Sequence, residues 1–331
     1  MRAPAACAAP VSPVETPEQA VAQETPLEKS TSEKRAASSK MSAVKYNAKT
    51  PPMLSPMAPP APRQSAQKPG QKQSLHDGPP PSAWLLALEF RAFWEFGALL
   101  PAWPVLAKAP RGDGHSVVIF PGLSANDGST MPLRRYLGSL GYQTSGWKQG
   151  FNFGPRAGVL EAARAQVTRA FNQSGRKVSL IGWSLGGIYA RELAKELPQM
   201  VRSVITLGTP FAGSHRSTNV WRIYELASGR KVARETEKYD LPSAPPVPTT
   251  SIYSRSDGIV AWQGSVQRPA AHNPQTENVE VIASHVGLGL NPSAWWAVAN
   301  RLAQAERNWQ PFERKGTFLH GLIYPDPARA G

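Results

Sequence analysis

The sequence predicts an α/β fold: a mostly parallel central sheet with helices on both faces. Three observations lead to this prediction. Short apolar runs alternate along the chain with segments that have the periodicity of amphipathic helices. The apolar runs are continuous, as expected for strands that are buried on both faces. Nearly all aromatic residues lie beyond residue 81, so the core-forming side chains belong to one part of the chain.

Residues 1–81 have the composition of a disordered tail rich in Pro, Ala and Lys. They hold 15 of the 33 prolines and one aromatic residue, Tyr46. Such a segment cannot bury enough apolar area to offset the entropy that is lost on ordering. We therefore expect a disordered tail over 1–81 and one folded domain over 82–325, a normal size for an α/β architecture.

The chain is basic, with a formal net charge of +14. Such a charge favours anionic surfaces of nucleic acid or lipid. The sequence has no zinc-finger spacing, no aromatic–basic RNA-binding signature and no arginine-dense helix, so we expect no specific nucleic-acid partner. Cys7 is the only cysteine, which rules out disulfides within the chain. The first residues lack the apolar core of a signal peptide, so a cytoplasmic location is expected. The oligomeric state is left open.

Residues 83–100, AWLLALEFRAFWEFGALL, form the most apolar long segment. A membrane-spanning helix needs about 20 predominantly apolar residues. Glu89, Arg91 and Glu95 interrupt this segment and Pro101 follows it, so we expect an amphipathic helix that is docked on the domain and ends at the proline. Peripheral contact with an anionic membrane, through this helix and the basic surface, is the alternative.

The remaining pattern places six strands and four further helices. Strands are expected over 115–122, 142–147, 177–183, 201–210, 249–257 and 278–285, and helices over 129–141 (capped by Ser129 or Thr130), 158–175, 185–198 and 292–309. Ligands of parallel sheets bind at the carboxyl ends of the strands. Ser184, Asp257, His285 and the loop 121–124 each lie at or just beyond an expected strand end, so we expect them to meet at one edge of the sheet.

Residues 182–186 read GWSLG, with a strand expected before them and a helix after them. This is the context in which G-x-S-x-G forms a nucleophile elbow, a sharp turn that presents a serine hydroxyl at a helix N-terminus. Gly182 and Gly186 would relieve crowding at the turn. The pattern therefore predicts Ser184 as a nucleophile, and a purely structural glycine turn is the alternative.

A serine nucleophile needs a base and a carboxylate that orients the base. His285 opens a glycine-containing loop after the last expected strand and is the best candidate base. Asp257 follows the penultimate strand and is preferred to Asp240, which lies in a polar, proline-bounded insert. The order Ser184, Asp257, His285 is the one expected for α/β-hydrolases. The other histidines are less suitably placed: His76, His115, His215, His272 and His320.

Two backbone N–H groups are needed to stabilise an oxyanion. The residue after the nucleophile, Leu185, is expected to supply one of them. Leu123, in the loop after the first strand, is expected to supply the other, because Gly122 before it allows a close approach of the backbone. A simple turn at Gly122 is the alternative.

Over residues 82–312 these motifs resemble the α/β-hydrolase superfamily, and more narrowly its bacterial esterase/lipase-like members. The stretches that carry the resemblance are PGLSANDGSTMPLRRYLGSLGY, GWSLGGIYARELA, VRSVITLGTPFAG, SIYSRSDGIVAW and ASHVGLGLNP. The resemblance implies the same triad and oxyanion donors, and no metal or organic cofactor. Two features differ: Pro121 stands where many lipases have histidine, and the insert at 212–248, where a lid often lies, is short and polar, with one expected helix at 220–229.

Together these features predict a serine hydrolase that cleaves a small-molecule ester or acyl-lipid substrate through an acyl-enzyme. Acyl transfer and thioester or amide cleavage use the same triad and are alternatives. A non-catalytic scaffold that recruits partners through its basic tail is a further alternative.

Overall fold

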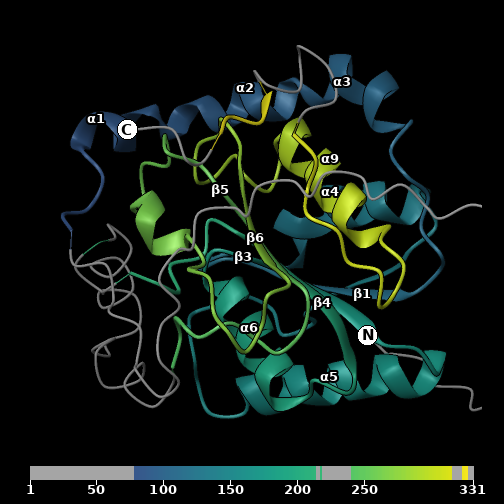
Figure 1. The fold of residues 1–331 in the computed structure, drawn as a ribbon. Helices are drawn as coiled ribbons and strands as arrows, with labels where there is room; N and C mark the ends of the chain where they lie inside the picture. Colours follow the sequence, from purple (N-terminus) through teal and green to yellow (C-terminus); the bar gives the residue numbers. More distant parts are fainter. Residues whose placement is uncertain (1–77, 214–216, 218–239, 315–322, 327–331) are drawn as a thin grey trace, which may run out of the picture. The chain divides into compact units, whose positions relative to one another are not determined.

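A computed structural model describes residues 78–213, 217, 240–314 and 323–326 (Figure 1). These residues belong to one compact unit, Pro60–Gly331. The disordered tail predicted over 1–81 lies outside the described residues up to residue 77. Most of the predicted lid insert over 212–248, with its expected helix at 220–229, also lies outside them. Both remain predictions.

The described residues contain a six-stranded sheet in the order β2-β1-β3-β4-β5-β6, and every neighbouring pair is parallel. The strands are β1 (Ser116–Phe120), β2 (Gln143–Gly146), β3 (Val178–Trp183), β4 (Val201–Leu207), β5 (Thr249–Tyr253) and β6 (Thr276–Glu280). The predicted parallel α/β fold is confirmed. Across the sheet, β2 lies on one side of β1, whereas β3, β4, β5 and β6 follow one another on the other side. The strand order therefore reverses between β1 and β3.

Helices cover both faces of the sheet. The helical segments are α1 (Ala83–Ala87), η1 (Leu88–Arg91), α2 (Ala92–Gly97), α3 (Leu99–Leu106), α4 (Asp127–Ser139), α5 (Val159–Ser174), α6 (Leu185–Glu196), η3 (Trp262–Ser265) and α9 (Pro292–Leu302). Val117 and Ile119 pack with buried residues of α3, α4 and α9, whereas Val118 and Phe120 pack with α5 and α6. Successive residues of a strand point to opposite faces of the sheet, so the side chains of β1 contribute alternately to two separate cores.

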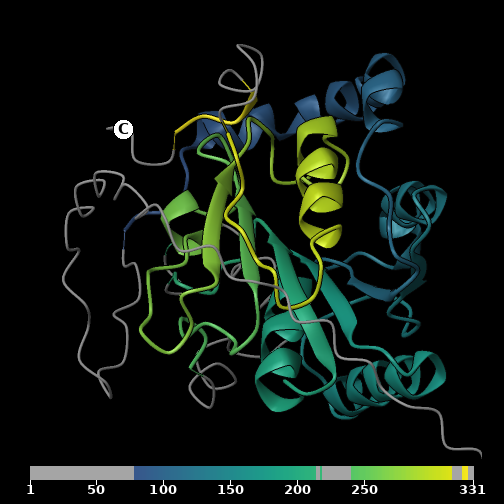
Figure 2. The same ribbon diagram turned by 45° about the vertical axis from the view of Figure 1, so that its right-hand side comes forward.

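The N-terminal helical segment differs from the prediction. A single helix over 83–100 that ends at Pro101 was expected, but the chain forms three short α-helices and one 3₁₀ turn that continue to Leu106. Pro101 is tolerated because it lies in the first turn of α3, where a backbone N–H has no acceptor within the helix. In Figures 1 and 2, α1, α2 and α3 (blue) form a row along the edge at which β5 ends. No helix in the described part of the chain is long and apolar enough to cross a membrane.

Two other helix ends also differ. The helix α4 is capped by Asn126, whose Oδ1 accepts a hydrogen bond from Gly128 N at 2.8 Å, and not by Ser129 or Thr130. The helix α9 ends at Leu302 and does not continue to residue 309. Arg307, within the predicted remainder of the helix, has a φ of +70°, which is incompatible with a right-handed helix that continues to residue 309.

The last two strands end earlier than predicted, so Asp257 and His285 lie in loops and not at strand ends. Beyond β6, Val281 N still donates to Tyr253 O at 2.9 Å, but from Ala283 to Val286 the backbone N–H groups bond to side chains in place of the neighbouring strand. Ala283 N donates to Ser254 Oγ at 3.2 Å, and His285 N donates to Glu89 Oε1 at 2.9 Å. These side-chain acceptors end the ladder and shape the loops that carry the site.

Candidate active site

Ser184 lies on a strained turn between β3 and α6. Its φ of +52° and ψ of −122° fall outside the regions that non-glycine residues usually occupy. The turn is held by a hydrogen bond from Ser184 N to Leu207 O at 2.8 Å. Since α6 begins at the next residue, the Ser184 side chain lies at a helix N-terminus, where negative charge is favoured.

The two elbow glycines are required by close backbone packing. A Cβ atom on Gly182 would lie 2.3 Å from Gly187 Cα, and one on Gly186 would lie 2.3 Å from Phe120 O. A Cβ atom on Gly187 would meet Thr209 Oγ1 at 1.9 Å. Side chains at these positions would force α6 away from the sheet, so the glycines keep the turn tight.

Ser184, His285 and Asp257 form a continuous hydrogen-bonded chain. His285 Nε2 lies 2.9 Å from Ser184 Oγ, and His285 Nδ1 lies 2.6 Å from Asp257 Oδ2. A carboxylate only accepts hydrogen bonds, so Nδ1 donates to Asp257 and leaves Nε2 to accept the hydroxyl proton. All three side chains are buried beneath the surface. The three residues that the sequence selected are therefore brought together in the arrangement that base-assisted nucleophilic attack needs.

Asp257 is fixed by its own loop. Its Oδ1 accepts hydrogen bonds from Ile259 N and Val260 N, both at 2.8 Å. These bonds stabilise the carboxylate and leave Oδ2 aimed at His285. The competing candidate Asp240 is exposed, and its backbone carbonyl accepts from Lys195 Nζ at 2.7 Å.

The pKa of His285 is shifted by opposing effects. Burial lowers it, but the charge of Asp257, the hydrogen bond to Asp257 and the charge of Glu89 outweigh burial. The pKa is raised above its ordinary value of 6.5. A raised pKa favours the imidazolium that forms when the histidine takes a proton from serine.

Among the other histidines, His115 lies at the opposite edge of the sheet, where it is bonded to Asp113 and Ser179. The ring of His272 lies 3.0 Å from Ala244 O on the surface. The remaining three, His76, His215 and His320, are outside the described residues.

The loop that carries Leu123 passes beside the serine. A Cβ atom on Gly122 would lie 3.3 Å from Ser184 Cβ. The loop is held by bonds from Ser124 N to Asn152 O at 2.7 Å and from Asn152 Nδ2 to Pro121 O at 2.8 Å. In the described part of the chain no hydrogen bond uses the Leu123 N–H. Leu185 is the first residue of α6, and its N–H likewise has no acceptor within the helix. Their role as oxyanion donors stays a prediction.

Sequence reasoning missed several residues that contact the site. Gly208, with a φ of +56°, has no Cβ, and a Cβ there would lie 3.1 Å from His285 Nδ1 and 3.2 Å from Asp257 Oδ2. Glu89 and Glu95 bond to the loops of the acid and the base. The signal in the sequence is that charges occur in an otherwise apolar segment, and by itself this signal indicates only an interruption of the apolar helix.

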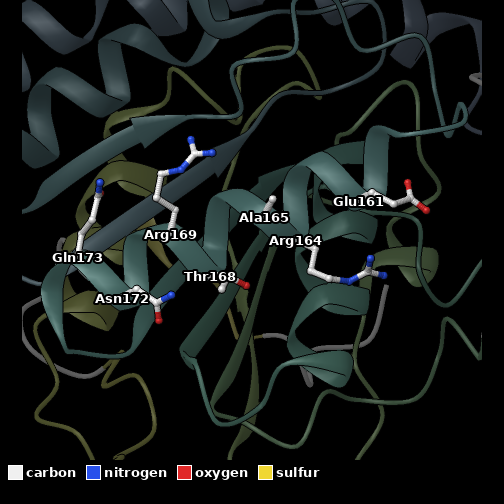
Figure 3. A pocket seen from close by; sticks show the side chains of 7 residues that line it. All are labelled: Glu161, Arg164, Ala165, Thr168, Arg169, Asn172 and Gln173. Atoms are coloured by element: carbon white, nitrogen blue, oxygen red, sulfur yellow. The ribbon is translucent and has the colours of Figure 1, made fainter.

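Figure 3 shows a shallow depression elsewhere, on the outer face of α5. Its lining comes from this one helix: Glu161, Arg164, Ala165, Thr168, Arg169, Asn172 and Gln173. These side chains are exposed or half-buried and none belongs to the site around Ser184. Within the described ranges, no group of three or more His, Cys, Asp or Glu side chains is placed to hold a metal ion.

A parallel sheet with this strand order, a serine on a strand-to-helix turn and the chain order Ser, Asp, His define an α/β-hydrolase fold. A scan against protein-family models and a search of curated proteins found no match. Among solved structures, lipase B from Aspergillus fumigatus is similar at 18% identity and a TM-score of 0.47, over 62% of this chain and 56% of the lipase. The present chain thus spans little more than half of that lipase.

Two further similar structures cover most of their own chains. One is the monoacylglycerol lipase of Paleococcus ferrophilus, at 16% identity and a TM-score of 0.43, over 59% of this chain and 96% of that one. The other is a thioesterase domain from the curacin biosynthetic pathway, at 14% identity and a TM-score of 0.40, over 59% and 93%. The function proposed below rests on the geometry of the site and not on these similarities.

Proposed function

We propose that the protein is a serine hydrolase that cleaves carboxylic esters through an acyl-enzyme. The observation that carries this proposal is that the hydrogen-bonded chain from Ser184 through His285 to Asp257, at the carboxyl edge of the sheet, begins at a serine on a strand-to-helix turn. The strained backbone of Ser184 at the start of α6 supports it, because nucleophile elbows place the serine in this way.

The reaction proceeds in two halves. His285 Nε2 takes the hydroxyl proton as Ser184 Oγ attacks the ester carbonyl, and Asp257 holds the ring in the required tautomer. The oxyanion rests on the N–H groups of Leu185 and Leu123. His285 then gives its proton to the departing alcohol. Water, deprotonated by His285, attacks the acyl-enzyme in the same way, and the acid is released as Ser184 recovers its proton.

A fluorophosphonate probe and an ester panel test this proposal. The probe is expected to label Ser184 and no other residue, as mapped by peptide mass spectrometry. A panel of p-nitrophenyl esters with graded acyl chains then gives the preferred acyl length. Absence of labelling together with absence of ester hydrolysis would favour the non-catalytic scaffold.

The same acyl-enzyme can pass its acyl group to other acceptors, so acyl transfer, thioester cleavage and amide cleavage remain alternatives. Rates measured with water alone and with added alcohol separate hydrolysis from transfer. Thioester and amide analogues of the best ester separate the remaining cases.

The outer face of the segment 83–106 supports contact with a lipid surface. Its largest apolar side chains are strongly exposed: Trp84, Phe90, Phe93, Trp94, Leu100 and Trp103. The only charged residues of the segment, Glu89, Arg91 and Glu95, bond inward to the domain. A face of aromatic residues without charges suits the boundary between headgroups and acyl chains, and the net charge of +14 suits anionic lipid. We therefore include peripheral lipid contact, with an acyl lipid as one substrate class, in the proposal.

Vesicle cosedimentation tests this part. The full chain is expected to sediment with phosphatidylcholine vesicles that contain phosphatidylglycerol. The double variant Phe93→Glu/Trp94→Glu should stay in the supernatant, whereas the control Thr168→Glu/Asn172→Glu, which adds the same charge to α5 (Figure 3), should sediment like the unaltered protein. Equal sedimentation of both double variants would contradict lipid contact by this face.

A further inference from the structure

One carboxylate outside the Ser184–His285–Asp257 chain joins the loops of the acid and the base. Glu89, in η1, accepts hydrogen bonds at Oε1 from Gly258 N at 2.8 Å and from His285 N at 2.9 Å. Its Oε2 accepts from Val286 N at 2.9 Å. A single side chain therefore holds the backbone of His285 itself and that of the residue after Asp257. Charge-assisted bonds of this kind are stronger than neutral ones.

Two neighbouring charged residues extend these contacts on the same segment. Glu95 Oε1 accepts from Ser284 N at 2.7 Å and from Arg91 Nε at 3.1 Å. Arg91 Nη2 donates to the carbonyl and the hydroxyl of Ser256, at 2.7 and 2.8 Å. The residues on both sides of Asp257, and those on both sides of His285, are thus bonded to the segment that precedes β1.

Two glycines in the loops permit this close approach. A Cβ atom on Gly258 would lie 2.2 Å from Leu85 O, and one on Gly287 would lie 1.7 Å from Glu95 Oε2. A side chain at Gly258 would meet backbone atoms and push the helical segment away from the loops, whereas one at Gly287 would displace the carboxylate of Glu95. The loops and the segment therefore have complementary surfaces that meet without a gap.

The charges around His285 come from two elements. Asp257 bonds to its ring from the loop after β5, and Glu89 bonds to its backbone N–H from η1, close enough for its charge to raise the pKa of the ring. The next charged residues are Glu95, which bonds to Ser284, and Arg91, which bonds to Ser256. These two residues also form an ion pair with each other. Asp257 and Glu89 are both negative and both stabilise a positively charged imidazole ring.

We propose that Glu89 is a positioning residue of the active site, which fixes the loops of His285 and Asp257 relative to each other and stabilises the imidazolium during attack by Ser184. This inference rests on the proposed function. It makes the segment 83–97 a part of the catalytic apparatus, although this segment precedes the sheet in the chain.

The test compares Glu89→Gln with Glu161→Gln in the full chain. The amide keeps the size of the side chain but loses the charge, and its NH₂ group cannot accept from Val286 N. We expect kcat on the best p-nitrophenyl ester to fall about 10- to 100-fold with little change in KM. Loss of an outer-shell residue that orients a metal ligand has an effect of this size in metalloenzymes. The acid limb of the kcat/KM profile should also move to lower pH, since removal of a negative charge disfavours the imidazolium. Glu161→Gln, on the exposed face of α5 (Figure 3), should match the unaltered protein in both.

A conservative variant and a folding check complete the test. Glu89→Asp keeps the charge but is too short to reach both loops, so its kcat should fall while the acid limb stays in place. Thermal unfolding establishes that each variant is folded, and Glu89→Asp decides the question should Glu89→Gln fail to fold. Wild-type kcat in Glu89→Gln, or in Glu89→Asp if only that variant folds, would overturn the inference and leave the proposed function intact. Undiminished activity of Ser184→Ala would instead overturn the proposed function itself.

Discussion

Two Ser–His–Asp hydrogen-bonded chains lie at opposite edges of the same sheet. At the carboxyl edge, His285 lies 2.9 Å from Ser184 Oγ and 2.6 Å from Asp257 Oδ2. At the amino edge, His115 Nε2 lies 2.8 Å from Ser179 Oγ, and its Nδ1 lies 2.5 Å from Asp113 Oδ1. The distances are nearly the same, so the hydrogen-bonded chain alone does not distinguish a catalytic site from a structural one.

The backbone and the surroundings of the two serines differ. Ser179 lies within β3, fully buried, and its hydroxyl also bonds to Ser203 Oγ at 3.0 Å. Ser184 lies beyond the strand, on a strained turn at the start of a helix. Only the second position offers a hydroxyl with unpaired backbone N–H groups beside it. The amino-edge cluster is therefore a polar network, buried at His115 and Ser179 and partly exposed at Asp113, that connects β3 and β4 with the residues before β1.

The two histidines also differ in their pKa. Burial, opposed by Asp113 but assisted by the charges of Arg202 and Arg176, lowers the pKa of His115. Asp113 is shared with these arginines, which donate to its Oδ2 at 2.7 and 2.6 Å. No cation competes for Asp257 in this way among its bonds in the described residues. The carboxylate that we propose as catalytic is thus left to one histidine, whereas Asp113 is divided among several partners.

Removal of each serine hydroxyl should give the largest contrast. Ser184→Ala is expected to lower kcat by about 10⁶-fold, as in other triads. Ser179→Ala should leave kcat within a few-fold of wild type and lower the free energy of unfolding by about 1–3 kcal/mol, because His115 loses a buried partner. Ester hydrolysis and urea unfolding measure the two effects. An inactive but stable Ser179→Ala protein would break the comparison.

The two carboxylates should differ almost as much. Asp257→Asn is expected to lower kcat by about 10⁴-fold, because an amide can favour the wrong tautomer of His285. Asp113→Asn should leave kcat nearly unchanged and lower the free energy of unfolding by about 1–2 kcal/mol, since this carboxylate is partly exposed. Steady-state kinetics of the two variants, each checked for a native melting transition, decide between these outcomes.

Two glycines with positive φ, Gly208 beside the carboxyl-edge cluster and Gly114 beside the amino-edge cluster, can be compared by substitution with alanine. Gly208→Ala would place a Cβ 2.7 Å from Leu288 Cδ1 and 3.1 Å from His285 Nδ1, and kcat should fall about 100-fold through displacement of the base. Gly114, with a φ of +82°, meets only Arg176 at 4.0 Å, so Gly114→Ala should cost about 1 kcal/mol of stability with no change in kcat. Equal kcat values for the two variants would show that Gly208 does not shape the site.

The smallest effect concerns pH. His285 must be neutral to accept a proton, and its pKa is raised above 6.5, so kcat/KM should fall with decreasing pH around a midpoint above 6.5. For His115 the sign of the pKa shift is opposite. The unfolded chain binds a proton there at higher pH than the folded protein, so its contribution to stability is complete above pH 6.5 and is lost as pH falls below it.

The variant His115→Asn isolates this second effect. Its free energy of unfolding should vary less between pH 7 and pH 5 than that of the unaltered protein, on the order of 1 kcal/mol less. The midpoint of kcat/KM should be the same in both proteins. A shift of that midpoint would mean that the two edges of the sheet are coupled.

Most of the fold could be predicted from local sequence. Continuous apolar runs gave the strands, and helical periodicity gave α4, α5, α6 and α9, because both patterns depend on which face each element buries. The errors lie at the ends of helices and strands, where a single hydrogen-bond partner decides at which residue the element begins or ends. Asn126 caps α4 in place of Ser129 or Thr130, and side-chain acceptors take the N–H groups of the loop from Ala283 to His285, where a strand was predicted. Such partners are chosen by geometry and leave little trace in composition.

The sequence by itself determined which serine, aspartate and histidine meet, because G-x-S-x-G fixes a turn locally and parallel strands bring their carboxyl ends to one edge. Only the tertiary structure decided the role of the N-terminal segment. Glu89 meets Gly258 and His285 across separations of 169 and 196 residues, and no periodicity or motif links positions so far apart. In the sequence Glu89 and Glu95 only interrupt an apolar segment, but in the fold they accept hydrogen bonds from backbone N–H groups of two loops. Buried backbone N–H groups need such partners wherever the fold places them.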